Sequence, residues 1–267
     1  MVKKLGIPKV LTIAGSDSGG GAGIQADIKT CSAFGVYCST AITAVTAQNT
    51  IGVTKIKEMS QEMIDAQIDS VLGDIGADVV KTGMLANSRI IQTVVKALMV
   101  HGVQKLVVDP VMVAKSGDSL LHPDSVKELC TKLLPLATIV TPNIPEAEII
   151  TGMSIKSSSD LDKAGLVILS MGVEAVVIKG GHSLGAPIDR LFTVDGKMEF
   201  PGQRVKTRST HGTGCTFAAA ISACLAKGFS LSESVMEAKV YVTGALKSAS
   251  PLGHGFGPLD HFFRHDS

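Results

Sequence analysis

The sequence predicts one α/β domain built on a central, mainly parallel β-sheet. Short apolar runs rich in β-branched residues alternate along the chain with segments of helical periodicity. Each apolar run is nearly continuous, which is typical of strands buried on both faces. The 267 residues show no linker-like change in composition and no internal repeat. A single domain over residues 1–267 is therefore expected.

Strands and helices can be assigned in order along the chain. The predicted strands cover residues 10–14, 37–45, 79–82, 105–109, 139–141 and 175–179. The predicted helices cover residues 24–34, 61–73, 88–101, 123–134 and 158–171, with two more from residue 215 onward and over residues 231–248. Two short strands at residues 191–194 and 198–200 flank Asp195-Gly196, which predicts a β-hairpin with a type I′ turn.

Composition narrows the classes of partner. Hydrophobic residues make up 45% and charged residues 18% of the chain, enough for a deep core. The net charge is +1, the basic residues are dispersed and tryptophan is absent, which argues against nucleic acid. No window is long and apolar enough to span a bilayer, so no membrane partner is expected.

Cysteine usage points to a reducing, cytoplasmic setting. The five cysteines form no CxxC pair, and their odd number does not suit a disulfide framework. Lys3 and Lys4 precede an apolar stretch, as in a signal peptide, but Pro8 and Lys9 interrupt it. We interpret the remaining apolar residues as the first strand.

Polar and glycine-rich loops follow the predicted strands. In an open parallel sheet the carboxyl ends of the strands form the ligand-binding edge, so these loops should converge. They cover residues 15–23, 46–50, 82–85, 109–118, 141–146 and 179–182. The first loop matches G-x-G-x-x-A only weakly, because six residues separate the strand end from Gly21 and no acidic residue ends the next strand. A flexible loop that closes over a small substrate is favoured over a dinucleotide site or a merely structural turn.

The stretch over residues 210–226, THGTGCTFAAAISACLA, carries the strongest chemical signal. Thr210, Gly212 and Gly214 disfavour a helix, whereas the residues from Cys215 onward are apolar and helical. A glycine turn that opens into a helix presents free N–H groups and the positive end of the helix dipole to an anion. Because helix N-termini lower thiol pKa values, Cys215 is expected to be a reactive thiol.

Two further elements suit a bound nucleotide. Asn143 and Glu146 end a strand and could hold Mg²⁺ through water, although the same spacing commonly caps a helix. Lys179 ends another strand and meets Gly180-Gly181, where a cation beside bare backbone suits a phosphate. An ordinary lysine at a strand end is the alternative interpretation.

Taken together, these motifs resemble the ribokinase-like superfamily, and within it the hydroxymethylpyrimidine and phosphomethylpyrimidine kinases of thiamine biosynthesis. The resemblance covers nearly the whole chain, through LTIAGSDSGGGAGIQAD, ITAVTAQNT, KTGML, DPVMVAKSGD, TPNIPEAE, KGGH, THGTGCT and GHGFGP. It implies a mostly parallel sheet flanked by helices. It also implies ATP with Mg²⁺, a small aminopyrimidine substrate that is phosphorylated twice, and a homodimer.

The resemblance also implies roles for individual residues. Gly212, Thr213, Gly214 and Cys215 correspond to the anion hole and to the residue that faces the substrate hydroxyl. Gln48 corresponds to the residue that hydrogen-bonds the aminopyrimidine, an amide pairing like that of glutamine with adenine. The other implied pocket residues are Gly15, Asp27, Met84 and Val111. The implied Mg²⁺ and ATP-phosphate group consists of Asn143, Glu146, Lys179 and Gly181.

Two other functions stay open at this point. A related branch with a THG-x-GC signature phosphorylates pyridoxal or pyridoxine, but it tends to lose the AQN element that this chain keeps at residues 47–49. A ligand-binding regulator on the same fold should lack the anion-hole glycines and the Asn143–Glu146 element. Because this chain has both features, a kinase is the favoured interpretation.

Overall fold

A central nine-stranded sheet organises the described part of the protein. The computed structural model describes residues 6–113, 117, 120–182 and 187–264. Within them the strand order is β3-β2-β1-β4-β5-β6-β7-β8-β9. The bounds are β1 Lys9–Asp17, β2 Tyr37–Gln48, β3 Val53–Glu58, β4 Val79–Thr82, β5 Leu106–Val108, β6 Ile139–Val140, β7 Ala175–Ile178, β8 Ile188–Thr193 and β9 Gly196–Pro201. The six strands from β2 to β7 pair in parallel, and β3, β8 and β9 add antiparallel edges, which confirms the predicted α/β class.

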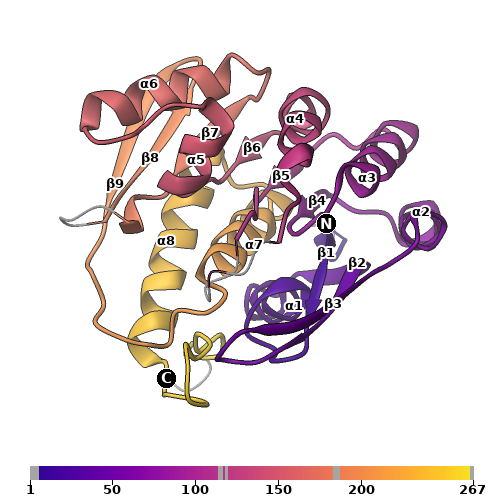
Figure 1. The fold of residues 1–267 in the computed structure, drawn as a ribbon, viewed down its shortest axis with the longest axis horizontal. Coiled ribbons are helices and arrows are strands. Elements are labelled where there is room, and N and C mark those ends of the chain that lie inside the picture. Colours follow the sequence, from indigo (N-terminus) through magenta and orange to yellow (C-terminus); the bar gives the residue numbers. More distant parts are fainter. Residues whose placement is uncertain (1–5, 114–116, 118–119, 183–186, 265–267) are drawn as a thin grey trace, which may run out of the picture.

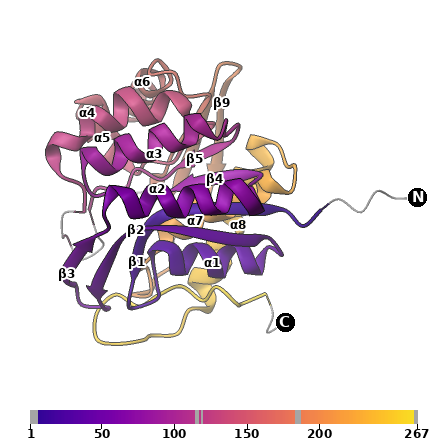
Figure 2. The ribbon, with the colours of Figure 1, turned by 90° about the vertical axis from the view of Figure 1, so that its right-hand side faces the viewer.

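Helices cover both faces of the sheet (Figures 1 and 2). One layer holds α1 Gly23–Ala33, α7 Thr213–Ala226 and α8 Leu231–Ser248, and its apolar side chains form one of two buried clusters. The other layer holds α2 Gln61–Ser70, α3 Ser88–Val100, α4 Val126–Glu128, α5 Ile144–Thr151 and α6 Ser158–Leu169, next to the second cluster. Alternate residues of the central strands supply the two clusters: Val79 joins the first and Val80 the second.

The structure departs from the predicted elements in places where local signals are weak. The edge strand β3 was not predicted, because its residues are mostly exposed and four of the six are charged or threonine. The short helix α5 was not predicted either, although its N-cap Asn143 was recognised. The predicted helix over residues 123–134 is a succession of short 3₁₀, α and π turns rather than one helix.

The predicted hairpin is confirmed, but its predicted turn is wrong. Thr193 pairs with Gly196, so Val194 and Asp195 are the two loop residues and the turn lies one residue earlier than expected. A type I′ turn needs positive φ at both loop residues. Among the described non-glycine residues only Ala86 has a positive φ, so the turn is not of this type.

The helix after the glycine turn begins two residues earlier than predicted. α7 starts at Thr213, and Gly212 is its N-cap with φ of 81°, in the left-handed region that favours glycine. Gly214 therefore lies inside the first turn, where the intrinsic cost of glycine is offset by the buried apolar residues that follow it. Gly214 and Cys215 thus place their backbone N–H groups at the free end of the helix.

The C-terminal segment crosses back over the first part of the sheet. The N–H of Phe256 donates to the carbonyl of Thr50 at 2.8 Å, and His211 forms a β-bridge with Pro258. His261 is buried, with Thr216 Oγ1 2.9 Å from its Nε2 and its carbonyl accepting from the Tyr241 hydroxyl. This segment fixes the β2–β3 turn beside the N-terminus of α7.

Candidate active site

The N-termini of α1 and α7 meet at the carboxyl edge of the sheet. A Cβ on Gly212, the N-cap of α7, would overlap the carbonyl oxygen of Gly21 and lie 3.2 Å from the Cα of Ala22, the N-cap of α1. Such a close approach is open only to glycine. The positive ends of two helix dipoles therefore face one region, which favours negative charge there.

A buried carboxylate holds the glycine loop in place. Asp17, the last residue of β1, accepts hydrogen bonds from the backbone N–H groups of Gly19, Gly21 and Ala22. Its Oδ2 also lies 2.8 Å from His211 Nε2, which joins the loop to the residues before α7. Burial tends to raise the pKa of Asp17, but the hydrogen bond and charge of His211 and these N–H donors lower it overall. The ordered loop is thus tied to α7 by side-chain chemistry that the sequence did not reveal.

Cys215 lies in the first turn of α7, half-buried at this junction. Burial raises the pKa of its thiol to about 12; the Lys81 ammonium lowers it, and the Asp109 and Asp27 carboxylates raise it further. The backbone N–H of Gly23, the first residue of α1, also favours the thiolate. The expectation of a lowered pKa is therefore wrong for the free protein, because burial and two carboxylates outweigh the helix N-terminus.

A cluster of alternating charges lies beside this turn. Lys179 Nζ is 3.2 Å from Asp109 Oδ1 and 4.0 Å from Glu146 Oε2. A Cβ on Gly214 would lie 3.4 Å from Lys179 Nζ and 3.7 Å from Asp109 Oδ2, so the first turn of α7 faces this ion pair directly. Burial acts against the charged lysine, but Asp109 and Glu146 outweigh it and raise the pKa of Lys179. Lys179 is therefore a permanent cation at the helix N-terminus.

Two polar groups here are left without partners. Asp109 Oδ2 and Thr210 Oγ1 are buried and have no hydrogen-bond partner among the described residues. Buried polar atoms are normally paired, so these two are candidates for contact with a bound ligand or ion. Asp109 was not singled out from the sequence, although its place directly after a buried strand was a usable signal.

The Asn143–Glu146 pair caps α5. Asn143 Oδ1 accepts from the N–H of Glu146, and Glu146 Oε2 accepts from the N–H of Asn143, both at 2.8 Å. The helix-capping interpretation is therefore confirmed, and it occupies the side-chain oxygen of Asn143. Burial raises the pKa of Glu146 to about 7, with Lys179 acting in the opposite direction and Asp109 reinforcing the shift. The carboxylate of Glu146 remains beside Lys179 at the site.

Some predicted substrate-pocket residues lie together. A Cβ on Gly15 would lie 3.0 Å from the sulfur of Met84, so these two residues are in contact. Gln48 ends β2, where its amide oxygen accepts from Thr46 Oγ1 at 3.1 Å and its Nε2 lies 3.5 Å from His211 Nε2. Val111 follows β5 and lines a small cavity with Asp109 and Gly83.

Asp27 and the two glycines after Lys179 differ in burial and in the space around them. Asp27 is fully buried and binds Thr12 and Lys81, rather than facing an open pocket. Gly181 is exposed with open space where a side chain would be, whereas a Cβ on Gly180 would overlap the Ile188 carbonyl oxygen. The loop over residues 109–118 lies partly outside the described residues.

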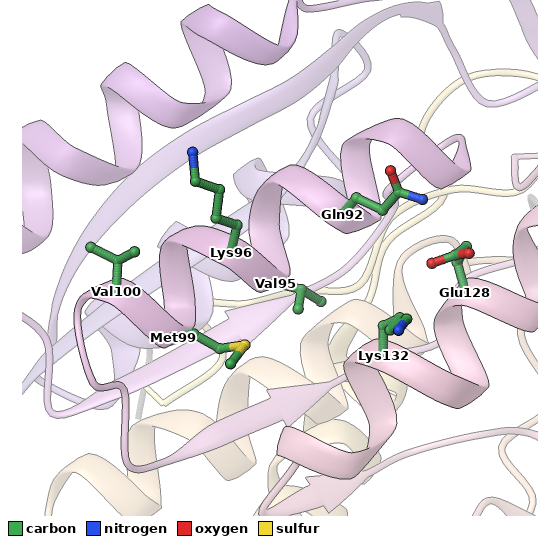
Figure 3. A pocket seen from close by; sticks show the side chains of 7 residues that line it. All are labelled: Gln92, Val95, Lys96, Met99, Val100, Glu128 and Lys132. Atoms are coloured by element: carbon green, nitrogen blue, oxygen red, sulfur yellow. The ribbon is translucent and has the colours of Figure 1, made fainter.

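A more open depression lies elsewhere and lacks comparable chemistry. It is formed by α3, α4 and the turn after α4, and Figure 3 shows its lining: Gln92, Val95, Lys96, Met99, Val100, Glu128 and Lys132. Most of these residues belong to the C-terminal half of α3, which leads toward the amino end of β5. The depression is therefore at the edge opposite the candidate site.

Across the described residues, no helix combines the length and the apolar character that crossing a membrane would need.

Comparisons with known proteins agree with this geometry. A family model described as phosphomethylpyrimidine kinase matches residues 17–260. A hydroxymethylpyrimidine/phosphomethylpyrimidine kinase of Rhizobium meliloti (strain 1021) is 48% identical, covering 95% of this chain and 97% of that protein. The crystal structure of phosphomethylpyrimidine kinase from Clostridium difficile 630 is 44% identical, with a TM-score of 0.81, covering 90% of this chain and 99% of that chain.

A pyridoxal kinase is similar as well. The ADP complex of the Bacillus subtilis pyridoxal kinase is 37% identical, with a TM-score of 0.90, and the alignment covers 97% of this chain and 99% of that chain. The mostly parallel sheet and its two helical layers are thus the ribokinase-like fold. The sequence matches extend over nearly the whole chain, and on these grounds the chain belongs to the phosphomethylpyrimidine kinase family.

Proposed function

We propose that this protein uses ATP to phosphorylate 4-amino-5-hydroxymethyl-2-methylpyrimidine and then its monophosphate, in thiamine biosynthesis. The observation that carries the proposal is the first turn of α7. There two helix N-termini meet, Cys215 lies in the first turn of α7, and a Cβ on Gly214 would lie 3.4 Å from Lys179 Nζ and 3.7 Å from Asp109 Oδ2. Family membership supports the substrate class, and the geometry of this turn supports phosphoryl transfer beside it.

The chain's own groups suit phosphoryl transfer. Such reactions pass through a loose transition state, so positioning and charge stabilisation matter most. The N–H groups of Gly214 and Cys215 and the ammonium of Lys179 would bind the oxygens of the γ-phosphoryl group. Gln48 and Met84 would hold the pyrimidine ring so that its hydroxymethyl group approaches Cys215. Cys215 would orient this hydroxyl and, after losing its own proton to water, would take the proton of the hydroxyl.

The same region fits a magnesium ion. Asp109 Oδ2 is unpartnered within the described residues, and Glu146 keeps one oxygen beyond its capping bond. No group of three metal-binding side chains occurs among the residues that the structure describes, which is compatible with Mg²⁺, since it often uses one or two carboxylates plus phosphates. When bound, Mg²⁺ would neutralise charge on the nucleotide phosphates. Asp109 and Glu146 would hold it. Asn143 would contribute indirectly, because its backbone N–H donates to the Glu146 carboxylate and so orients it.

Two successive steps can use one site. The alcohol carries a proton that must leave as its oxygen bonds to phosphorus, whereas the monophosphate is already anionic near neutral pH. The second acceptor therefore needs charge stabilisation by Lys179 and α7 but no proton acceptor. A pocket that admits both acceptors next to the same γ-phosphate can complete both reactions.

An ATP-consumption assay on the purified protein tests the proposal. We expect turnover with the aminopyrimidine alcohol and, separately, with its monophosphate, and little turnover with pyridoxal. Omitting Mg²⁺ should abolish both activities. Turnover with pyridoxal alone would replace the proposal by the related kinase activity, and absence of ATP consumption with every acceptor would favour a ligand-binding protein. We also propose that the protein is cytoplasmic, as its cysteine usage suggests, and that it is a homodimer, as the family resemblance implies. Sedimentation velocity of the purified protein tests the oligomeric state.

A further inference from the structure

A fully buried ion pair lies beneath the junction of α1 and α7. Lys81 Nζ is 2.9 and 3.0 Å from the two carboxylate oxygens of Asp27, and both side chains are 1% exposed. Asp27 also accepts a hydrogen bond from the hydroxyl of Thr12. Lys81 is in β4, at the centre of the sheet, where an apolar side chain would be usual.

Strand register and helix periodicity place this pair under the thiol. Thr12 and Lys81 are direct neighbours on β1 and β4, so both point toward the layer that contains α1 and α7. Asp27 is one helical turn after Gly23, on the same face of α1. Since Gly23 begins the helix that abuts the first turn of α7, the carboxylate and its ammonium partner lie directly behind that turn.

The surrounding residues leave space for the ammonium group. A Cβ on Gly83 would lie 3.0 Å from Lys81 Nζ, so a side chain at this position would crowd it. A buried ion pair is also a poor source of stability, because removing two charges from water offsets most of their attraction. The pair therefore calls for a functional explanation.

We propose that Lys81, held by Asp27, is a positioning residue that stabilises the negatively charged form of Cys215 during the first phosphorylation. This inference rests on the proposed function and deepens it. In that step the alcohol oxygen bonds to the γ-phosphorus while the bond to the β–γ bridging oxygen breaks, and ADP leaves with the electron pair. The Cys215 thiol first gives its own proton to water, and the resulting thiolate then takes the alcohol's proton, which regenerates the thiol.

The charges around the sulfur support this role. Burial opposes the thiolate most strongly, and Lys81 in β4 is the largest opposing influence on the thiol pKa. Asp109 after β5 and Asp27 in α1 oppose the thiolate, while the N–H of Gly23 favours it. Lys179, the other nearby cation, is likewise paired, with Asp109 and Glu146. Of the two lysines, Lys81 is the one that most favours the thiolate.

Alkylation by iodoacetamide tests the inference without any substrate. The rate at Cys215 is measured from pH 7 to pH 10 by mass spectrometry of its peptide, with Cys130 on the opposite face of the sheet as internal standard. At fixed pH the rate follows the thiolate fraction. We expect Lys81→Met to slow alkylation of Cys215 by about tenfold or more, the effect of one pKa unit, without changing Cys130. A merely loosened structure would expose the sulfur and accelerate the reaction instead.

Two further variants keep the test decisive. Thr12→Val removes a hydrogen bond to Asp27 but keeps both charges, so the alkylation rate should stay within about twofold of wild type. The double variant Lys81→Met with Asp27→Asn leaves no unpaired buried charge. It replaces Lys81→Met in the alkylation test if the single variant does not fold. We expect a rate between those of wild type and Lys81→Met.

An unchanged or faster rate at Cys215 in a folded Lys81→Met protein, or in the double variant, would overturn the inference. Failure of the kinase proposal would appear separately, as an absence of ATP turnover in wild type while the alkylation differences persist.

Discussion

At the scale of single residues, Cys215 differs from a conventional activated cysteine. Its position at a helix N-terminus is typical of a lowered thiol pKa, yet burial and the neighbouring carboxylates raise the pKa to about 12. The thiol is consequently protonated at neutral pH in the free protein. Cys215 must therefore lose this proton before it can accept the proton of the alcohol.

Replacing the thiol should separate the two phosphorylation steps. We expect Cys215→Ala to reduce turnover of the alcohol by about 10²–10⁴-fold, the usual worth of a proton-transfer group. Turnover of the monophosphate should fall much less, because that acceptor has no such proton to lose. Steady-state kinetics with each acceptor measures this. Equal losses with both acceptors would assign Cys215 to packing or to the phosphate site.

The amide of Gln48 should control recognition of the pyrimidine. Gln48→Leu would leave two polar ligand groups without partners, at about 1–3 kcal/mol each. We expect the affinity for the aminopyrimidine to fall by roughly 2–6 kcal/mol, about 30-fold or more. ATP binding is the internal control and should barely change. If calorimetric titration shows intact pyrimidine affinity, or an equal loss for ATP, the substrate lies elsewhere.

At the scale of elements, the contact between α1 and α7 is the most constrained feature. Two glycines with positive φ allow a direct test: Gly212 at the contact and Gly228 in open space. Alanine at either position should cost about 1–2 kcal/mol for its backbone conformation. Gly212→Ala should lose at least about 2 kcal/mol more, because its methyl group overlaps Gly21. Chemical denaturation of both variants measures the difference, and similar losses would show that the two helices separate easily.

The sequence predicted those elements whose patterns are strong. The strand over residues 79–82 and the helix over residues 231–248 have the predicted bounds, because one is continuously buried and the other has clear caps. β3 escaped prediction because an exposed edge strand has no buried face to impose a pattern. The start of α7 was misplaced because glycine propensity yields to the buried run that follows it.

The site was predictable only where a motif lies on one segment. Gly212–Cys215 and Lys179 come from two such segments, and the structure brings them together. The partnership of Asp17 with His211, and that of Lys81 with Asp27, joins segments far apart in the chain. No local periodicity encodes which distant charges meet, so these pairs required the three-dimensional structure.

At the scale of the whole molecule, two buried groups should make the free energy of unfolding depend on pH in opposite directions. Glu146 has a folded pKa raised from 4.5 to about 7, so its contribution is full below pH 4.5 and is lost as pH rises through 7. Burial lowers the pKa of His261 from 6.5 to about 4, so its contribution is full above pH 6.5 and is lost as pH falls through 4. The two slopes should largely cancel between about pH 4.5 and 6.5.

Replacing one of these two groups at a time should reveal the pH dependence that the other contributes. The free energy of unfolding of Glu146→Gln should rise with pH across this window, and that of His261→Gln should fall, each by up to about 1.4 kcal/mol per pH unit. Urea titrations at pH 4.5, 5.5 and 6.5 measure both trends against wild type. Parallel curves for all three proteins would contradict the assigned charge states.

The contact between α1 and α7 has a consequence for the order in which the newly synthesised chain folds. Asp17 and His211, which fasten the two helix starts together, are 194 positions apart. During synthesis from the N-terminus, β1 and α1 exist long before α7, and the part of α1 that contacts α7 stays uncovered until then. Closing so long a loop is entropically costly and slow, so it belongs to the late events of folding. A growing chain therefore has no phosphate-binding turn until its last helices arrive, and catalytic competence should appear with the final act of folding rather than by stages.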